Sequence, residues 1–233
     1  MSSKGGKMVE IERKFLVVGD TSAKIANAGG TFSGEVTLSD SYFDDENYSL
    51  TKRDYWLRCR NSKWELKMPP KNRQDDSDCT QYQEVTTETD IFAQLSAILS
   101  TGDEDVVNGN EQSTKDISES QLVETFVKRR GLEPFAVFTS NRKNYSFQGG
   151  ISVTVDEADF GFQVGEIEMM VEENDGEMIS KAIADIHTLA ESLGLESTVP
   201  VQGKLETYLA KQCPAHFWTL VRAGVLREPQ GHH

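Results

Sequence analysis

The chain has 233 residues, of which 37% are hydrophobic and 27% are charged, and its net charge is −14. This composition suits one large or two small globular domains and excludes a long disordered chain. A surface this acidic repels nucleic acid and anionic membranes. An anionic ligand would therefore need a local cluster of the 24 Lys and Arg residues.

Nothing in the chain resembles a membrane anchor or an export signal. No apolar run approaches the roughly 18 residues that a membrane helix needs, and residues 1–7 contain no apolar stretch. The cysteines, Cys59, Cys79 and Cys213, are odd in number and lack zinc-type spacing, and the histidines form no cluster. The sequence therefore predicts a reduced, cytoplasmic protein without a disulfide framework or a transition-metal site.

The first predicted element is a strand over residues 9–15. Because side chains alternate along a strand, Glu10, Glu12 and Lys14 share one face, and mainly apolar residues occupy the other. Paired carboxylates can hold a hard divalent cation, and an ammonium group can hold a phosphate oxygen. The alternative is an ordinary solvated strand face with cross-strand ion pairs.

A short helix is predicted over residues 20–30, and a strand over residues 36–44 places Asp40, Tyr42 and Asp44 on one face. A hairpin follows, with strands over residues 54–60 and 63–68 that meet at a tight Asn61-Ser62 turn. The polar faces of its two strands can lie side by side. They carry Trp56, Arg58, Arg60, Glu65 and Lys67.

Beyond the hairpin, alternating polar and apolar residues predict strands, and apolar residues at helical spacing predict helices. The predicted strands cover residues 81–86, 135–147, 151–156 and 163–172, with a hairpin turn at 148–150. The predicted helices cover residues 87–99, 119–130, 176–193, 204–212 and 214–223. Two polar stretches, residues 69–79 and 101–118, are predicted to be loops within one domain.

The polar faces of the strands form one set of charged residues. Its members are Glu10, Glu12, Lys14, Arg58, Arg60, Glu65, Lys67, Glu84, Arg142, Glu166 and Glu168. The opposite faces are apolar, and amphipathic helices are available to cover them, so helices lie outside and charge lies inside. This arrangement predicts an α+β fold in which the sheet closes into a barrel around a charged, water-filled tunnel. Because a charged interior is costly when empty, we expect a divalent cation and a chain of phosphates to fill it.

Several stretches of the chain resemble the CYTH superfamily, the triphosphate tunnel metalloenzymes. The segment Glu10-Ile11-Glu12-Arg13-Lys14 is similar to the ExExK signature of this superfamily, and the resemblance runs over about residues 8–226. The later matching stretches are residues 55–60, 64–67, 82–84, 156–168 and 203–205. Residues 54–58, 158–166 and 204–209 most resemble the animal thiamine triphosphatase branch. A single domain with disordered ends, residues 1–7 and 227–233, is therefore expected.

The resemblance implies a closed, eight-stranded antiparallel barrel with helices packed outside. It also implies Mg²⁺-dependent hydrolysis, with Mn²⁺ as a substitute, of the terminal phosphate of a small-molecule triphosphate. The implied metal ligands are Glu10, Glu12, Asp156, Glu166 and Glu168, and the implied triphosphate-binding residues are Lys14, Arg58, Arg60, Lys67, Arg142 and Lys204. Glu10 and Glu12 would also orient the attacking water through a second metal ion. Lys67 would assist the leaving diphosphate, and Glu84 would orient basic residues or contact a cationic substrate.

Two positions determine how far the resemblance to the thiamine branch extends. Trp56 either offers an aromatic face to the thiazolium of thiamine, a cation–π contact, or is a packing residue. Thr154 and Asp156 occupy two alternating positions at which the thiamine branch carries acidic residues, so one carboxylate is missing here. If Thr154 replaces a metal ligand, metal affinity or metal choice differs.

Three functions therefore remain open. The first is a thiamine triphosphatase. The second is an inorganic tripolyphosphatase, which becomes the better-supported function if Trp56 is buried in packing. The third is a non-catalytic polyphosphate-binding module. Thr154 is the reason to consider it, because a threonine there can mean that a metal ligand has been lost. An adenylyl cyclase fits the thiamine-like stretches less well, and the acidic surface disfavours an RNA triphosphatase. Nothing marks a dimer interface, so we expect a monomer.

Overall fold

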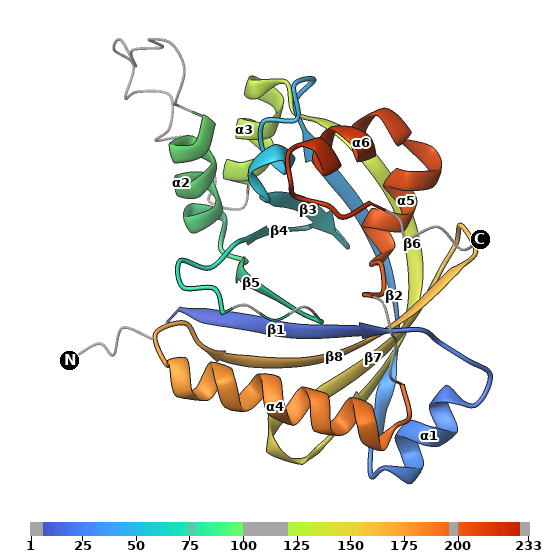
Figure 1. Ribbon diagram of the computed structural model, residues 1–233. Helices are drawn as coiled ribbons and strands as arrows, with labels where there is room; N and C mark the ends of the chain where they lie inside the picture. Colours follow the sequence, from blue (N-terminus) through green and yellow to red (C-terminus); the bar gives the residue numbers. More distant parts are fainter. Residues whose placement is uncertain (1–6, 75, 77, 100–120, 196–199, 229–233) are drawn as a thin grey trace.

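A closed antiparallel barrel forms the centre of the computed structural model, which describes residues 7–74, 76, 78–99, 121–195 and 200–228. Within these residues eight strands follow one another around the barrel in the order β1-β5-β4-β3-β2-β6-β7-β8, and β8 pairs with β1 to close it (Figure 1). They are β1 (Met8–Phe15), β2 (Thr31–Asp44), β3 (Trp56–Arg60), β4 (Lys63–Met68), β5 (Cys79–Val85), β6 (Glu133–Ser146), β7 (Ser152–Ala158) and β8 (Phe162–Glu172). The predicted eight-stranded α+β barrel is confirmed.

Six helices surround the barrel in the described part of the chain. They are α1 (Thr21–Asn27), α2 (Glu88–Leu99), α3 (Leu122–Arg130), α4 (Gly176–Ser192), α5 (Lys204–Gln212) and α6 (Pro214–Arg222), and short 3-10 turns lie at η1 (Thr51–Arg53) and η3 (Gln148–Gly150). Each helix lies within a predicted one. None of the helices in the described ranges is long and apolar enough to cross a membrane. The predicted loop at residues 101–118 and most of the predicted disordered ends lie outside the described residues.

The strand β2 begins earlier than its predicted start at residue 36. Its first residues pair with the end of β6, where Phe32 lies opposite Tyr145. This end of the ladder is solvated: Phe32 is 55% and Val36 is 40% exposed. Alternation between buried and exposed residues is therefore absent there, which removes the pattern on which strand prediction depends.

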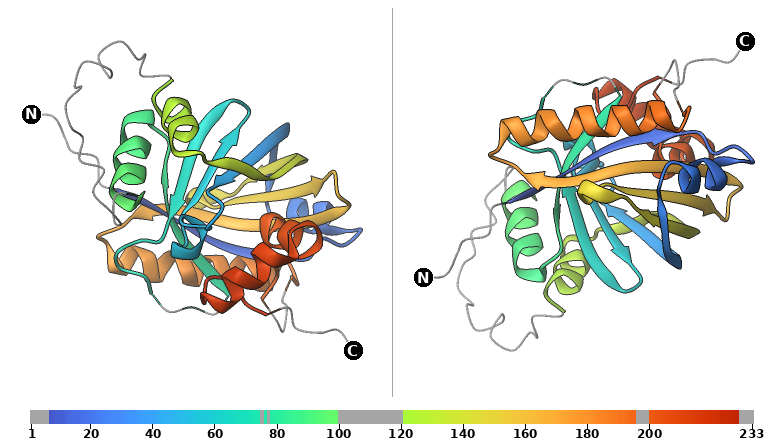
Figure 2. Two further views of the ribbon diagram at one scale, coloured as in Figure 1. Left: turned by 90° about the horizontal axis from the view of Figure 1, so that it is seen from above. Right: turned by 90° about the horizontal axis from the view of Figure 1, so that it is seen from below.

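The apolar faces of the strands point outward and are covered by helices. The longest helix, α4, lies along β1 and β8 on the outside of the barrel (Figure 2). Ile11 and Ile167 from the strands pack there with Ile179 and Ile186 from α4. Each such fully buried side chain contributes about 1.5–3 kcal/mol. Because the apolar residues are used on this outer surface, the alternate residues of the same strands face the barrel interior.

The helices α5 and α6 pack where the barrel interior is apolar. Tyr42 of β2 and Phe138 of β6 contact Leu205 and Tyr208 of α5 in one cluster. Tyr42 also pairs directly with Arg58 across the β2–β3 ladder, so it faces the same side of the sheet as that arginine. The packing places the first residue of α5, Lys204, in a buried position with only 7% of its surface exposed.

The β3–β4 hairpin turns tightly at Asn61 and Ser62, as predicted. Both residues have positive φ, 46° and 64°, which is the conformation of a two-residue hairpin loop. The side chain of Asn61 also accepts a hydrogen bond from the Ser39 backbone N–H at 2.8 Å. The turn fixes the register that places Arg58 opposite Glu65, and a slip of one residue would move both out of the interior.

Candidate active site

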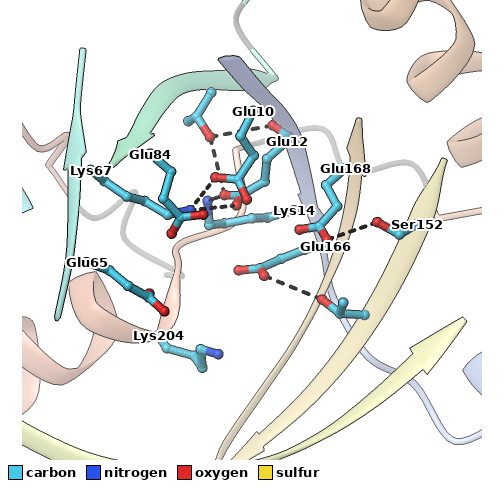
Figure 3. Close-up of polar contacts among 12 residues, drawn as sticks. Glu10, Glu12, Lys14, Glu65, Lys67, Glu84, Ser152, Glu166, Glu168 and Lys204 are labelled. Atoms are coloured by element: carbon cyan, nitrogen blue, oxygen red, sulfur yellow. Dashed lines mark hydrogen bonds and ion pairs between the residues drawn. The ribbon is translucent and has the colours of Figure 1, made fainter. Parts of the chain in front are cut away.

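Three carboxylates meet on one wall of the tunnel. Glu10 and Glu12 come from β1, and Glu168 of β8 lies directly opposite Glu12 in the ladder (Figure 3). One oxygen from each of the three groups lies within 4.8 Å of the others. The hydroxyl of Ser152 donates to Glu168 Oε1 at 2.9 Å, and that of Thr80 donates to Glu12 Oε1 at 3.3 Å. These hydroxyls orient the carboxylates without neutralising them.

The chemistry of this group suits a hard divalent cation. Burial, together with the charges of Glu10 and Glu166, raises the pKa of Glu168 to about 7. Burial also raises the pKa of Glu10, even though Lys67 opposes the shift. Carboxylates that repel each other in this way gain stability when a cation binds between them, and oxygen donors alone favour Mg²⁺ or Mn²⁺. Glu10, Glu12 and Glu168 therefore fit the metal that the sequence implies.

Two lysines face these carboxylates. The ammonium of Lys14 contacts Glu12, and that of Lys67 contacts Glu10 and lies 4.0 Å from Glu12. Burial alone would lower the pKa of Lys67, but the charges of Glu10 and Glu12 raise it above its usual value. Both lysines therefore remain cationic across the physiological pH range and can bind phosphate oxygens.

The other two predicted metal ligands, Asp156 and Glu166, are paired with cations. Arg142 donates to both oxygens of Asp156 at 2.8 and 2.7 Å and to Glu166 at 2.9 Å, and Lys204 contacts the same aspartate. Although burial would raise the pKa of Glu166, the charges of Arg142 and Lys204 hold it far below its usual value. Glu166 is thus an anion, and the contacts of Asp156 and Glu166 position Arg142 and Lys204.

Arg58 and Arg60 come from β3, three strands away from β1 around the barrel, and each is held by acidic partners. Arg58 donates to Glu65 at 2.5 Å and to Glu84 at 3.0 Å. Arg60 makes a forked contact with Asp40 at 2.6 and 2.8 Å. The sequence pattern placed Asp40 on an alternating face of its strand, but did not connect it with the charged set. Only the β2–β3 register, in which Asp40 pairs with Arg60, shows this role.

Trp56 is packed rather than open to solvent. It is 9% exposed and lies in a cluster with Leu209, Phe217 and Leu220 of α5 and α6. Its indole N–H donates to Asp54 Oδ1 at 2.8 Å, and the hydroxyl of Tyr82 donates to the same oxygen at 2.7 Å. Asp54 was not predicted as a site residue. Its sequence signal is that it begins the stretch over residues 54–58 that resembles the thiamine branch.

The β7–β8 ladder fixes the position of Thr154. This residue lies directly opposite Glu166, and its hydroxyl is 3.5 Å from the Glu166 carboxylate. Asp156 lies opposite Arg142 in the neighbouring β6–β7 ladder. Both side chains therefore contact tunnel residues, and of the two positions only residue 156 supplies a carboxylate.

A closed barrel whose interior brings a carboxylate cluster together with buried lysines and arginines defines a tunnel protein that holds a polyanion and a cation together. Figure 3 shows the carboxylates of this set and the lysines Lys14 and Lys67 pointing toward one another from the surrounding strands, with Lys204 of α5 nearby. The family model of the CYTH domain matches residues 8–201. The chain belongs to this family.

Curated relatives are similar over nearly the whole chain. The thiamine-triphosphatase of Macaca fascicularis is 32% identical over 215 residues, which cover 92% of this chain and 90% of the relative. The human thiamine-triphosphatase is 32% identical over 222 residues, which cover 95% of this chain and 93% of the relative.

Solved structures share the fold at low sequence identity. The PH1819 protein of Pyrococcus horikoshii OT3 superimposes with a TM-score of 0.59 at 18% identity, covering 87% of this chain and 99% of that one. A putative adenylate cyclase from Vibrio parahaemolyticus gives a TM-score of 0.56 at 17% identity, covering 88% of this chain and 99% of that one. At this identity the likeness concerns the fold alone.

Proposed function

We propose that the protein is a Mg²⁺-dependent hydrolase that removes the terminal phosphate of thiamine triphosphate, giving thiamine diphosphate and phosphate. The observation that carries the proposal is the cluster of Glu10, Glu12 and Glu168, with oxygens within 4.8 Å of one another, beside Lys14 and Lys67 inside a closed barrel. The names of the macaque and human relatives support thiamine triphosphate as the substrate.

Substrate binding exchanges the ion pairs of the tunnel. Lys14, Lys67, Arg142 and Lys204 are each paired with a tunnel carboxylate. The triphosphate would take over these cations, together with Arg58 and Arg60. Glu65, Glu84 and Asp40 hold the two arginines in place, and the remaining N–H groups of the arginines can donate to phosphate oxygens.

Glu10, Glu12 and Glu168 would hold Mg²⁺. Once bound, this ion neutralises charge on the phosphates and favours attack on the terminal phosphorus. Glu10 and Glu12 would orient the attacking water by accepting its hydrogen bonds, and Lys67 would stabilise the leaving diphosphate. Asp156 and Glu166 complete the implied metal set. A metal at these carboxylates would release Arg142 and Lys204 to the phosphates.

The packing of Trp56 favours a second candidate, an inorganic tripolyphosphatase. The indole lies against α5 and α6 with its N–H directed to Asp54, so a thiazolium would reach the ring face only if these contacts changed. Selective loss of thiamine triphosphate turnover in Trp56→Ala, with tripolyphosphate turnover retained, would assign the residue to the organic cation. Equal turnover of both substrates in this variant would favour the inorganic triphosphatase.

The proposal includes Mg²⁺ as the physiological metal, a monomer and a cytoplasmic location. The three cysteines are free in the structure, which suits a reducing compartment. Light scattering at micromolar concentration tests the monomer: a mass near 26.0 kDa is expected, and twice that value would contradict it.

The deciding experiment measures phosphate release from thiamine triphosphate, tripolyphosphate and ATP in parallel, with Mg²⁺ or with EDTA. Turnover of thiamine triphosphate is expected only with Mg²⁺. Glu10→Gln and Glu12→Gln should lower kcat by about 10²-fold or more, the range for removal of a directly acting catalytic group. Glu35→Gln, at an exposed position, is the matched control. A folded protein that binds tripolyphosphate and hydrolyses none of the three would instead be the binding module.

A further inference from the structure

A second cluster of metal-ligating side chains lies outside the tunnel. Asp76 belongs to the β4–β5 loop, Cys79 is the first residue of β5, and His187 lies on α4. Cys79 pairs with Arg13 in the β1–β5 ladder, one residue away from the inward-facing Glu12, so its side chain points to the outer surface beneath α4. The tunnel chemistry uses none of these residues.

We propose that Asp76, Cys79 and His187 form a binding site for a borderline transition-metal ion of the Zn²⁺ class. His187 Nε2 lies 3.1 Å from Asp76 Oδ2 and 3.9 Å from Cys79 Sγ, and one donor atom of each residue lies within 4.8 Å of the others. Tetrahedral Zn²⁺, with bonds of about 2.0–2.3 Å, holds such atoms about 3.3–3.6 Å apart. Only small side-chain movements would therefore complete the site.

The exposure of the cluster allows a metal to enter. Cys79 is 2% exposed, whereas the side chains of His187 and Asp76 are 29% and 19% exposed. A thiolate at the base with imidazole and carboxylate at the rim leaves a fourth position open to water. Sulfur and nitrogen donors favour Zn²⁺ or Co²⁺ over Mg²⁺, so this site would differ in selectivity from the all-oxygen group in the tunnel.

Arg13 is the residue that metal binding must displace. Its Nη1 donates to His187 Nδ1 at 2.8 Å, which places the imidazole proton on Nε2, the nitrogen needed by the metal. Binding would move that proton to Nδ1, and Arg13 would turn to Asp78, whose carboxylate is already 3.6 Å from its Nη2. Metal ligation requires the thiolate, so the Cys79 thiol loses its proton to solvent as the metal–sulfur bond forms. One proton is thus released per ion bound.

Cobalt(II) is the probe that separates this site from the tunnel. Full-length protein saturated with Mg²⁺ would be titrated with Co²⁺, and the absorption spectrum recorded. We expect one equivalent to produce the thiolate-to-cobalt charge-transfer band in the near ultraviolet and the strong visible bands of a tetrahedral site. All-oxygen carboxylate ligation gives neither.

Variants test each ligand in turn. Cys79→Ser should abolish the charge-transfer band, and His187→Gln and Asp76→Asn should weaken Co²⁺ binding by at least about 10–100-fold, the cost of losing even an outer-shell partner. Cys213→Ser is the matched control and should leave the band unchanged. Arg13→Gln should tighten binding, because an amide oxygen can accept the Nδ1–H that Arg13 opposes.

Two results would overturn the proposal. One is the absence of the charge-transfer band in folded wild-type protein at excess Co²⁺, which would leave the cluster a hydrogen-bond network between the β4–β5 loop and α4. The other is a band that persists in Cys79→Ser. Circular dichroism of every variant separates loss of metal binding from loss of the fold. Because the readout is spectroscopic, the outcome is independent of any triphosphatase activity.

Discussion

Carboxylates and cations in the tunnel are partners of one another before any ligand binds. Glu12 contacts Lys14, Glu10 contacts Lys67, and Asp156 contacts Lys204. An unpaired buried charge would be strongly destabilising, so this mutual pairing is what allows a charged interior to exist. A triphosphate with its divalent cation carries both negative and positive charge. When it replaces the ion pairs of the tunnel, the phosphates pair with the lysines and arginines and the cation pairs with the carboxylates, so few charged side chains lose a partner.

Gly203 gives Lys14 its position in the tunnel. A Cβ at residue 203 would meet Lys14 Cε at 2.8 Å, while the φ of −78° is open to any residue. Gly203→Ala should therefore displace Lys14 without straining the backbone. We expect tripolyphosphate affinity to fall about 10-fold, which corresponds to about 1.4 kcal/mol. This is slightly less than the loss of a complete charged hydrogen bond, which costs about 1.5–3 kcal/mol. Isothermal titration calorimetry with Mg²⁺ measures this.

The control for that substitution is Gly176→Ala. At this first position of α4, a Cβ has no neighbour closer than Gln74 Nε2 at 3.8 Å. Affinity and thermal stability should both stay near those of the wild type. Equal losses of affinity in the two variants would show that Gly203 has no special relation to Lys14.

His216 is a buried residue that makes the fold sensitive to acid. Thr51 donates its hydroxyl proton to Asp44 at 2.6 Å, so its oxygen accepts from His216 Nε2 at 2.9 Å, and the ring stacks on Tyr48 with centroids 3.8 Å apart. Burial, with a smaller effect of Lys52, lowers the pKa of His216 to about 4. The neutral imidazole is therefore the form that the native state requires.

The unfolded state takes up this proton more readily, since its histidine pKa is about 6.5. The free energy of unfolding should therefore be fully retained above about pH 6.5 and fall as the pH drops toward 4, by about 3 kcal/mol at most. Urea unfolding at several pH values measures this. In His216→Phe, which keeps an aromatic ring against Tyr48, the slope over this window should be smaller. An unchanged slope would assign the acid sensitivity to other groups.

At the scale of the elements, the register of β7 against β8 determines which residues face the tunnel. Thr154 lies opposite Glu166, where an aspartate would add a carboxylate beside the acidic group. Thr154→Asp should tighten Mg²⁺ binding about 10-fold, because an added charge near a divalent ion contributes on the order of 1 kcal/mol after desolvation. The Mg²⁺ dependence of turnover measures it, with Thr154→Asn as the neutral control. Identical behaviour of the two variants would argue that residue 154 lies outside the metal's reach.

The predictability of each element depends on how its residues divide between two environments. β1, β4 and β8 alternate between an apolar outer surface and a charged interior, so both their structure and the inward-facing position of Glu10 or Lys67 follow from the sequence pattern. The exposed start of β2 shows no alternation. The pairing of Asp40 with Arg60 depends on cross-strand register. The grouping of Asp76, Cys79 and His187 arises only when α4 packs on the barrel, so sequence spacing could not indicate it.

At the scale of the whole molecule, the barrel should be more stable with its ligands than without them. A ligand at 100 times its dissociation constant adds about 2.7 kcal/mol to the free energy of unfolding. For a domain of this size that corresponds to a rise in Tm of about 5–10 °C. Differential scanning calorimetry with Mg²⁺ and tripolyphosphate together measures it.

Mg²⁺ alone or tripolyphosphate alone should give a smaller rise in Tm, because Mg²⁺ pairs only with the tunnel carboxylates and tripolyphosphate only with the lysines and arginines. The double variant Glu10→Gln, Glu12→Gln should lose the part of the rise that depends on Mg²⁺. NaCl at matched ionic strength is the control for general screening. A rise of equal size with NaCl would attribute the effect to the surface charge of −14 rather than to the tunnel.

The pairing of β1 with β8 also sets the order in which the molecule can be assembled. Val9 forms its ladder contact with Val171, so β1 closes the barrel only after synthesis has continued as far as residue 171. Such distant pairings fold slowly, because a long loop must close before any contact forms. Until then β1 has an exposed edge and an apolar face without α4. A newly made chain should therefore depend on chaperones until α4 is complete, and truncation before residue 172 should yield aggregates instead of a smaller barrel.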